Sequence, residues 1–576
     1  MGILFKYLKN YKKEAVLAPL FKMLEATFEL LVPLVVAVIV DSGIGGGDRG
    51  LAVRMSLLLL GLGIVGLICS VTAQYFSARA ATGASAEIKA SLLDKIQSMS
   101  YSAIDKMGVS TLITRMTGDV SQVQTGINLT LRLLLRSPFV VFGAVVVAFT
   151  VDVRSALIFA AVVPILAVII FAVLLVTIPM YRRVQQKLDR VTGAIRENHT
   201  GVRVIRAFGE EGHEESLFAE NTADLLAYQK KTARISALLN PLTYAVISLG
   251  MIVLLYRGAF DVNDGRISRG ELFALHGLMS QILVELVKFA NLVITITKSI
   301  AGAKRIEQVL NSDSENTVPE AEVSNSDYAV ELKNVSLTYS GAGDKTLEGI
   351  SLAAKRGERI GIIGGTGSGK SSLVNLIPGF YLPTEGSVSV FGKAPAGAET
   401  PDILSRIAVV PQRAVLFAGT VRSNVAVGKP DATDEEIRKA IELAQISDII
   451  SDERGGLDAE VLAGGKNLSG GQRQRLTVAR ALVRRPEILI LDDSASALDL
   501  ATEAALRRAI ESLEGITVFT VSQRASSVMR CDKILVLENG EAVGVGDHNG
   551  LLEGCPVYRE IYYSQFPEGE VSADEN

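Results

Sequence analysis

The 576-residue sequence contains no tryptophan, only three cysteines and only four histidines. The missing tryptophan removes one of the usual side chains that anchor a protein at a membrane interface. The spacings of Cys69, Cys531 and Cys555 fit neither a disulfide framework nor a zinc site, so we expect three unbridged thiols. The formal net charge of −4 is small for this length, so no global positive field indicates nucleic acid as a partner.

Long apolar runs, by contrast, occupy the first half of the sequence, and 48% of all residues are hydrophobic. The third and fifth runs are short, but each reaches the roughly 20 residues of a spanning helix when neighbouring semi-polar residues such as 129–136 join it. We predict six membrane-spanning helices; buried helices of a soluble protein are the alternative. The six runs cover approximately Ala15–Val40, Met55–Ala78, Ser137–Thr150, Ala156–Met180, Pro241–Tyr256 and Leu272–Ile296.

The orientation in the membrane follows from the basic residues that precede the first run. Lysines stand at positions 6, 9, 12 and 13, and the positive-inside bias places this end in the cytoplasm. The first run is too long for the core of a cleavable signal peptide, so we expect it to be retained. The long connections 79–136 and 181–240 then face the cytoplasm, and their recurring apolar positions predict helices that continue beyond the bilayer.

The composition changes after residue 310. Residues 311–328 are polar and acidic and are typical of a linker, whereas short Val/Ile/Leu-rich runs alternate with helical patterns from residue 329 onward. The predicted fold is therefore that of a multidomain membrane protein. An all-α six-helix transmembrane domain (1–310) and the linker (311–328) precede an α/β domain (329–576).

A glycine-rich loop follows the apolar strand 359–363 and precedes a helical segment, as a phosphate-binding loop requires. Its backbone N–H groups can surround phosphate oxygens, Lys370 can reach the β- and γ-phosphates, and the Ser371 hydroxyl can ligate Mg²⁺. The α/β domain (329–576) is therefore predicted to be an α/β P-loop nucleotide-binding domain, with ATP and Mg²⁺ as its cofactors. The candidate binding residues of this loop are Gly364, Gly367, Gly369, Lys370, Ser371 and Ser372.

A second apolar strand, 488–491, ends in Asp492 and Asp493. A carboxylate at the end of a central strand can hold Mg²⁺ through water, and Asp492 is our candidate. Alone, the pattern equally fits a solvated strand end. Together with the upstream loop it favours a nucleotide site.

Between these two motifs lies the pentapeptide Leu468-Ser-Gly-Gly-Gln472, and with it the sequence resembles the ATP-binding cassette family, whose signature this is. Physically, Ser469 and the amides of Gly470 and Gly471 at a helix start suit a γ-phosphate. In the family, the signature contacts the ATP held by the opposite subunit. The resemblance further implies an adenine-stacking aromatic, a loop glutamine near Mg²⁺ and a D-loop, which correspond to Tyr339, Gln412 and Ser496–Asp499.

The first half resembles the exporter type of this family. The resemblance implies that the stretches Gly108–Val120 and Gly201–Glu211 contact the nucleotide-binding domains. It also implies the inner or plasma membrane of a bacterium, with the nucleotide-binding domain in the cytoplasm. Membrane lipid and a small amphipathic substrate are then the expected partners, besides a second half-transporter.

Two positions depart from the family pattern. The family's competent ATPases carry Glu after the Mg²⁺-linked aspartate, whereas this chain has Asp493, whose carboxylate is drawn back by about 1.5 Å, a shift that can cost on the order of a hundredfold in rate. The family's switch histidine is replaced by Gln523, which cannot carry charge. We therefore predict a degenerate site in a heterodimer whose partner supplies Glu and His. A slow homodimer and a non-hydrolytic regulatory subunit are the alternatives.

Charged residues also occur inside the apolar runs. Lys22, Glu25 and Glu29 lie in or near the first run, and Glu285 and Lys288 lie in the sixth, each set at helical spacing. Such groups are costly in lipid, so they should face one another or a water-filled substrate pathway. Snorkelling of Lys22 and a structural pair with Glu25 form the alternative.

Overall fold

The structure is a computed structural model that describes residues 6–312, 327–339, 343–396, 400–451 and 455–566. The chain divides into two compact units. The N-terminal unit comprises Met1–Ile96 and Ser110–Asn311, and the C-terminal unit comprises Gln97–Val109 and Ser312–Asn576. Most of the predicted linker lies outside the described residues.

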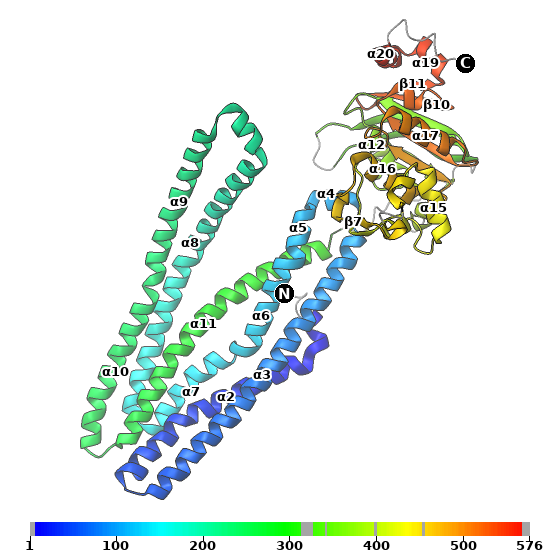
Figure 1. Ribbon diagram of the computed structural model, residues 1–576. Coiled ribbons are helices and arrows are strands. Elements are labelled where there is room, and N and C mark those ends of the chain that lie inside the picture. Colours follow the sequence, from blue (N-terminus) through cyan, green and yellow to red (C-terminus); the bar gives the residue numbers. More distant parts are fainter. Residues whose placement is uncertain (1–5, 313–326, 340–342, 397–399, 452–454, 567–576) are drawn as a thin grey trace. The chain divides into compact units, whose positions relative to one another are not determined.

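The N-terminal unit is built from long helices, and six helical stretches of the described chain are long and apolar enough to cross a membrane. This confirms the predicted number of spans. Figure 1 shows the helices in blue to green. The main helices are α2 (Lys12–Val38), α3 (Arg49–Gln97), α6 (Val120–Leu133), α7 (Arg136–Val151), α8 (Val153–Phe208), α9 (Glu211–Ala237), α10 (Leu239–Asn263) and α11 (Arg269–Leu310).

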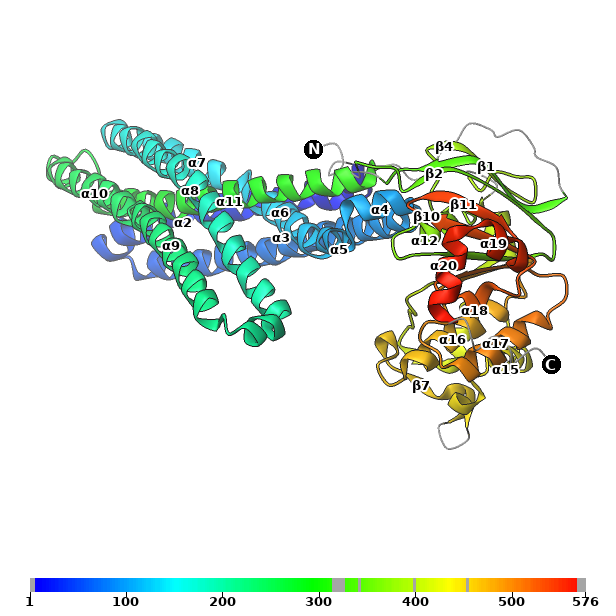
Figure 2. The same cartoon turned by 90° about the horizontal axis from the view of Figure 1, so that it is seen from above.

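Local sequence explains where these helices begin and end. The Asp152 side chain accepts the Ser155 N–H at 2.7 Å and caps α8 at its N-terminus. Gly209, with a left-handed φ of 69°, ends the same helix. α8 and α9 run side by side as a hairpin (Figures 1 and 2), so the long connection 181–240 continues the membrane helices as the sequence indicates.

The turns that follow the first, third and fifth spans lie at one end of this bundle. The Asp41 carboxylate, from the π-helical segment η2 (Ile39–Gly45) after α2, accepts the Gly270 N–H at 2.7 Å and also binds the Ser268 hydroxyl. Ser268 in turn forms a capping box with Glu271 at the start of α11. By the orientation above, this is the external end.

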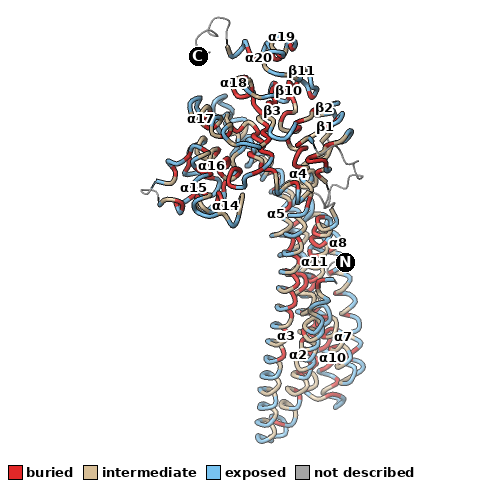
Figure 3. Tube along the Cα trace, turned by 90° about the vertical axis from the view of Figure 1, so that its right-hand side faces the viewer, coloured by how far each residue is buried: buried red, intermediate tan, exposed pale blue. Residues whose placement is uncertain are grey.

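The C-terminal unit contains a six-stranded and a three-stranded sheet. The six-stranded sheet has the order β11-β10-β3-β9-β8-β5 and is parallel except for the pair β10–β11; β2-β1-β4 form the antiparallel sheet. The inner strands are buried along their length, and Figure 3 shows buried positions gathered around β3 and β10. The strands are β1 (Tyr328–Leu337), β2 (Leu347–Lys355), β3 (Arg359–Gly364), β4 (Glu385–Val390), β5 (Ile407–Val410), β8 (Ile488–Asp492), β9 (Thr517–Ser522), β10 (Lys533–Glu538) and β11 (Glu541–Gly546).

Helices cover this sheet, as an α/β fold requires. Those that position functional residues are α12 (Lys370–Leu376), α16 (Gly470–Leu482), α17 (Leu500–Glu511), α18 (Ala525–Val528) and α20 (Pro556–Gln565). β3 and β8 each lie beside β9, so the predicted phosphate loop and the aspartate pair leave neighbouring parts of one sheet at the same edge.

The short helix α4 (Tyr101–Met107) belongs to the C-terminal unit although it follows α3 in the chain. The Tyr101 ring stacks on Phe380 with centroids 4.6 Å apart, and the Tyr381 hydroxyl donates to Asp105. The contact therefore falls just before Gly108–Val120, the stretch that the family resemblance implied.

Candidate functional site

The loop after β3 has the backbone conformation that its glycines permit. Gly367 and Gly369 have φ values of 83° and 92°, in the left-handed region. At Gly364 a Cβ atom would lie 2.1 Å from the Leu537 carbonyl oxygen, so only glycine fits there. These glycines leave a loop whose backbone surrounds the head of Lys370.

Lys370 is almost fully buried at the start of α12. Its ammonium group donates to the carbonyl oxygens of Gly364 and Gly365 at 2.8 and 2.5 Å. Burial lowers the pKa of Lys370, while the nearby Asp493 and Asp492 act in the opposite direction. The loop thus holds a desolvated cation beside its backbone, which suits an anionic ligand.

Asp492 lies at the end of β8, and its carboxylate accepts a hydrogen bond from the Ser371 hydroxyl at 2.9 Å. Burial raises the pKa of Asp492, and the charge of Asp493 adds to this effect. The two oxygen side chains come from separate predicted motifs. Their juxtaposition is the donor set that a hard divalent cation prefers, so these residues fit Mg²⁺.

Asp493, next to Asp492 after β8, and Gln523, just after β9, lie at the same site. Gln412 donates its amide N–H to the Asp493 carboxylate at 3.2 Å, and Asp493 has a left-handed φ of 44°. The Thr366 hydroxyl donates to Gln523 Oε1 at 3.4 Å, which joins the glycine-rich loop to the segment after β9. The structure therefore brings both departures from the family pattern to the glycine-rich loop.

The segment after β9, residues 523–527, is held by two side chains that sequence reasoning missed. Gln565 of α20 donates to the Gln523 carbonyl and accepts the Ala525 N–H, both at 2.9 Å. Buried Glu503 of α17 accepts from Arg524 at 2.9 Å and from the Ser527 hydroxyl at 2.5 Å. No motif marks either residue, because both contacts join segments far apart in the sequence.

Tyr339 lies beside the same loop. Its hydroxyl group donates to Ser372 at 3.0 Å, and its ring meets Tyr381 edge-on at 5.0 Å between centroids. One edge of the ring is therefore fixed, as a stacking platform for a base would require.

The signature pentapeptide forms the start of α16. Ser469 caps this helix and exchanges hydrogen bonds with Gln472 in a capping box. A Cβ atom at Gly470 would meet nothing within 4 Å, so this backbone is open on its outer side. No hydrogen bond among the described residues links the pentapeptide to the loop around Lys370. Asp499 separately caps α17 through the Thr502 N–H.

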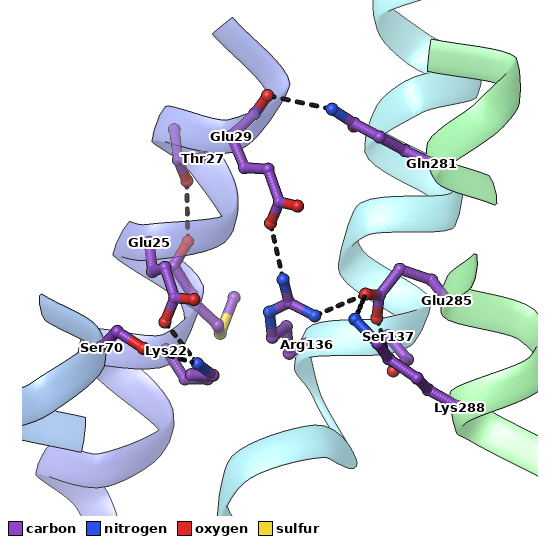
Figure 4. Close-up of polar contacts among 11 residues, drawn as sticks. Lys22, Glu25, Thr27, Glu29, Ser70, Arg136, Ser137, Gln281, Glu285 and Lys288 are labelled. Carbon is purple, nitrogen blue, oxygen red and sulfur yellow. Dashed lines mark hydrogen bonds and ion pairs between the residues drawn. The ribbon is translucent and has the colours of Figure 1, made fainter. Parts of the chain in front are cut away.

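A second polar cluster lies inside the N-terminal unit (Figure 4). Arg136, at the start of α7, binds Glu29 of α2 and Glu285 of α11, each at 2.5 Å. Ser137 and Lys288 also donate to Glu285, at 2.9 Å each. The sequence analysis missed Arg136, although its place at the start of the third apolar run was a signal for a paired intramembrane charge.

Lys22 lies beside this cluster rather than reaching the surface. Its side chain is 8% exposed and binds Glu25 at 2.5 Å and the Ser70 hydroxyl of α3 at 3.1 Å (Figure 4). The five predicted intramembrane charges are therefore all paired, and three of them meet at Arg136 or its partner. A hollow of about 530 Å³ beside this cluster is lined by Glu25, Glu29 and Arg136.

Comparison with known proteins gives matches over nearly the whole chain. The ABC transporter transmembrane region matches residues 16–286, and the ABC transporter family matches residues 347–496. The ABC transporter ATP-binding protein YfiB of Bacillus subtilis (strain 168) is 33% identical over 97% of this chain and 98% of that protein. The ATP-dependent lipid A-core flippase of Syntrophus aciditrophicus (strain SB) is 30% identical over 85% of this chain and 82% of that protein.

A solved structure shows the same fold. A bacterial Atm1-family ABC exporter with ATP bound superposes with a TM-score of 0.81, covering 97% of this chain and 99% of that one, at 22% sequence identity.

Proposed function

The chain belongs to the ATP-binding cassette transporter family as an ATP-driven, multi-pass membrane exporter, and from this premise we propose that it is one half of a heterodimer that exports an amphipathic compound. In this proposal its own nucleotide site binds ATP but hydrolyses it slowly. Its signature motif completes the active site of the partner half.

The observation that carries this proposal is the pair Asp493 and Gln523 at an otherwise well-formed site. Gln412 and Thr366 contact these two side chains at 3.2 and 3.4 Å, which supports assigning them the positions of the family's water-activating Glu and switch His. A shorter carboxylate reaches less far toward an attacking water, and an amide cannot take up a proton. We therefore expect this site to bind ATP without hydrolysing it efficiently.

Each binding residue then has a role. Lys370 and the amides of the glycine-rich loop hold the phosphates, and Tyr339 stacks on the base. Ser371, Asp492 and Gln412 would hold Mg²⁺, which when bound supplies positive charge against the phosphates. Ser469, Gly470 and Gly471 contact the partner's ATP, which agrees with the open space outside Gly470.

We place the contact with the transported compound at the hollow beside Glu25 and Glu29. The Glu29 side chain is 42% exposed although it binds Arg136, so its carboxylate can meet a polar group of a substrate. Apolar residues such as Leu59 and Leu62 line the rest of the hollow. Such a mixture of a few charged side chains and apolar walls suits an amphipathic compound, either drug-like or lipid.

The proposal is tested with the full chain in nanodiscs, alone and co-purified with a half-transporter encoded beside it. We expect Mg-ATP binding by the chain alone with little hydrolysis, and substrate-stimulated hydrolysis and transport in inverted vesicles by the complex. Brisk hydrolysis by the chain alone would support the homodimer instead. ATP binding without stimulated turnover in any complex would support a regulatory subunit.

A further inference from the structure

A hollow of about 850 Å³ lies between α8 and α10, away from the polar cluster at Arg136. Its walls are apolar side chains that the rest of the chain leaves open: Leu157, Ile165 and Leu249 are 59%, 49% and 62% exposed. Arg154 and Arg257 line one end of it. The hollow is therefore an apolar groove with two cations at one end.

The dimensions of this groove match one leaflet of a bilayer. The residues from Arg154 to Ile165 rise about 16 Å along α8, close to half of the roughly 30 Å hydrocarbon core. At the floor, a Cβ atom on Gly250 would lie 2.8 Å from a Val162 methyl group, so α8 and α10 are in close contact there. The groove is thus closed below and open to the side.

The two arginines are available to a ligand. Asp261 also lines this end, but its carboxylate binds Arg266 at 3.0 Å. Asp152, two residues before Arg154, is engaged as the cap of α8. The backbone N–H of Arg154 donates to Asp152, and the charge of Arg154 also acts on that carboxylate. Neither the Arg154 nor the Arg257 guanidinium group, however, forms a salt bridge or a side-chain hydrogen bond with another described residue.

Both arginines lie near turns at the external end of the bundle. Arg154 stands at the start of α8, just after the turn from α7, and Arg257 stands in the last two turns of α10. With the cytoplasmic N-terminus predicted above, this end is at the outer headgroup level, and the groove runs inward from it.

We infer that this groove binds a phospholipid of the surrounding bilayer, with an acyl chain along α8 and α10 and the phosphate of an anionic headgroup between Arg154 and Arg257. Guanidinium groups bind phosphate oxygens in a bidentate manner, and two of them at the headgroup level favour a net negative lipid. This site does not depend on which compound the protein transports.

The test measures lipid retention by native mass spectrometry after mild detergent extraction, with phosphatidylglycerol and phosphatidylcholine as probes. We expect wild-type protein to retain phosphatidylglycerol in preference to phosphatidylcholine. The double variant Arg154→Gln/Arg257→Gln should bind phosphatidylglycerol about thirtyfold more weakly and lose the preference. The matched control is Arg49→Gln/Arg54→Gln, which removes two exposed arginines at the start of α3, outside the groove.

A second variant tests whether the apolar part of the groove holds the acyl chain of the lipid. Ala161 is exposed and lines the groove, so Ala161→Trp should reduce retention of both lipids while Mg-ATP binding stays unchanged. Equal phosphatidylglycerol retention by the wild type, the double variant and the control would overturn the inference. So would efficient cross-linking of a Leu249→Cys variant to the other half of the transporter in native membranes, because the groove would then be a protein interface.

Discussion

Asp492, the proposed Mg²⁺ ligand, is a buried carboxylate whose ionised form lowers the stability of the ligand-free chain. Its pKa is raised by burial, so the folded, ligand-free chain disfavours the ionised form relative to the unfolded chain, and stability falls as pH rises through the raised pKa. We expect Asp492→Asn to raise the melting temperature of the ligand-free domain at neutral pH. Mg-ATP should no longer raise the melting temperature of this variant further, because the carboxylate that would bind Mg²⁺ is lost.

Differential scanning calorimetry of the full chain with and without Mg-ATP checks this. Ser371→Ala is the matched control, since it removes the 2.9 Å hydrogen bond to the same carboxylate and keeps its charge. It should lower the ligand-free melting temperature. If the melting temperature of Asp492→Asn also falls, the hydrogen bond from Ser371 and the charge of Lys370 outweigh the cost of burying the ionised carboxylate in the ligand-free protein.

The two departures at Asp493 and Gln523 make a joint prediction. The single variant Asp493→Glu restores the reach of the carboxylate but leaves an amide at the switch position, so we expect little gain. The double variant Asp493→Glu/Gln523→His should raise steady-state hydrolysis by the chain's own site at least about tenfold. Phosphate release by the purified chain measures both.

The same double variant combined with Lys370→Ala should lose the gain, because the nucleotide is no longer held. If Asp493→Glu alone gives the full increase, the missing histidine has no part in the slow rate.

At the scale of elements, helix α20 directly contacts the segment after β9 that carries Gln523. The side-chain amide of Gln565 donates to the Gln523 carbonyl and accepts the Ala525 N–H. It therefore fixes the backbone on both sides of the Gln523 side chain, which accepts a hydrogen bond from Thr366. We expect Gln565→Met, which removes both hydrogen bonds, to weaken nucleotide affinity severalfold. In Gln565→Glu the side chain can still accept the Ala525 N–H, but it has lost the N–H that donates to the Gln523 carbonyl, so a carboxyl oxygen faces that carbonyl oxygen. Ionisation of the carboxyl group strengthens this repulsion, so the variant should weaken nucleotide affinity more at high pH than at low pH.

Equilibrium binding of a fluorescent ATP analogue at several pH values separates these variants. Gln445→Met is the control: this exposed glutamine donates only to a nearby carbonyl in its own segment. Identical pH profiles for Gln565→Glu and wild type would argue against the positioning role.

Elements that depend on local sequence were predictable. The six spans, the helical extensions and the glycine-rich loop follow from periodicity and from motifs of a few consecutive residues. Arg136 and Gln565 were not predictable in their roles, because each acts through residues more than 35 positions away that no pattern links to it. The position of the α4 contact, just before the implied stretch, likewise depends on tertiary packing around Phe380.

At the scale of the whole molecule, the polar cluster joins three helices of the membrane domain, α2, α7 and α11. Arg136 binds α2 and α11 at once and is almost fully buried, so removing it leaves two carboxylates without their shared partner. We expect Arg136→Gln to lower the thermal stability of the membrane domain and transport together. The triple variant Arg136→Gln/Glu29→Gln/Glu285→Gln should recover stability in part, as measured by size-exclusion after heating.

The division of labour between two halves gives the most decisive prediction, because the two nucleotide motifs of this chain serve different sites in the proposed complex. Ser469→Ala weakens a donor group at the partner's competent site and should lower turnover of the complex by about a hundredfold. Lys370→Ala acts on the slow site and should weaken ATP binding there while a measurable part of the turnover remains. In a homodimer both substitutions act on every site, so each would abolish hydrolysis. Steady-state phosphate release by the purified complex, with each variant confined to this chain, therefore separates the two assemblies without knowledge of the transported compound.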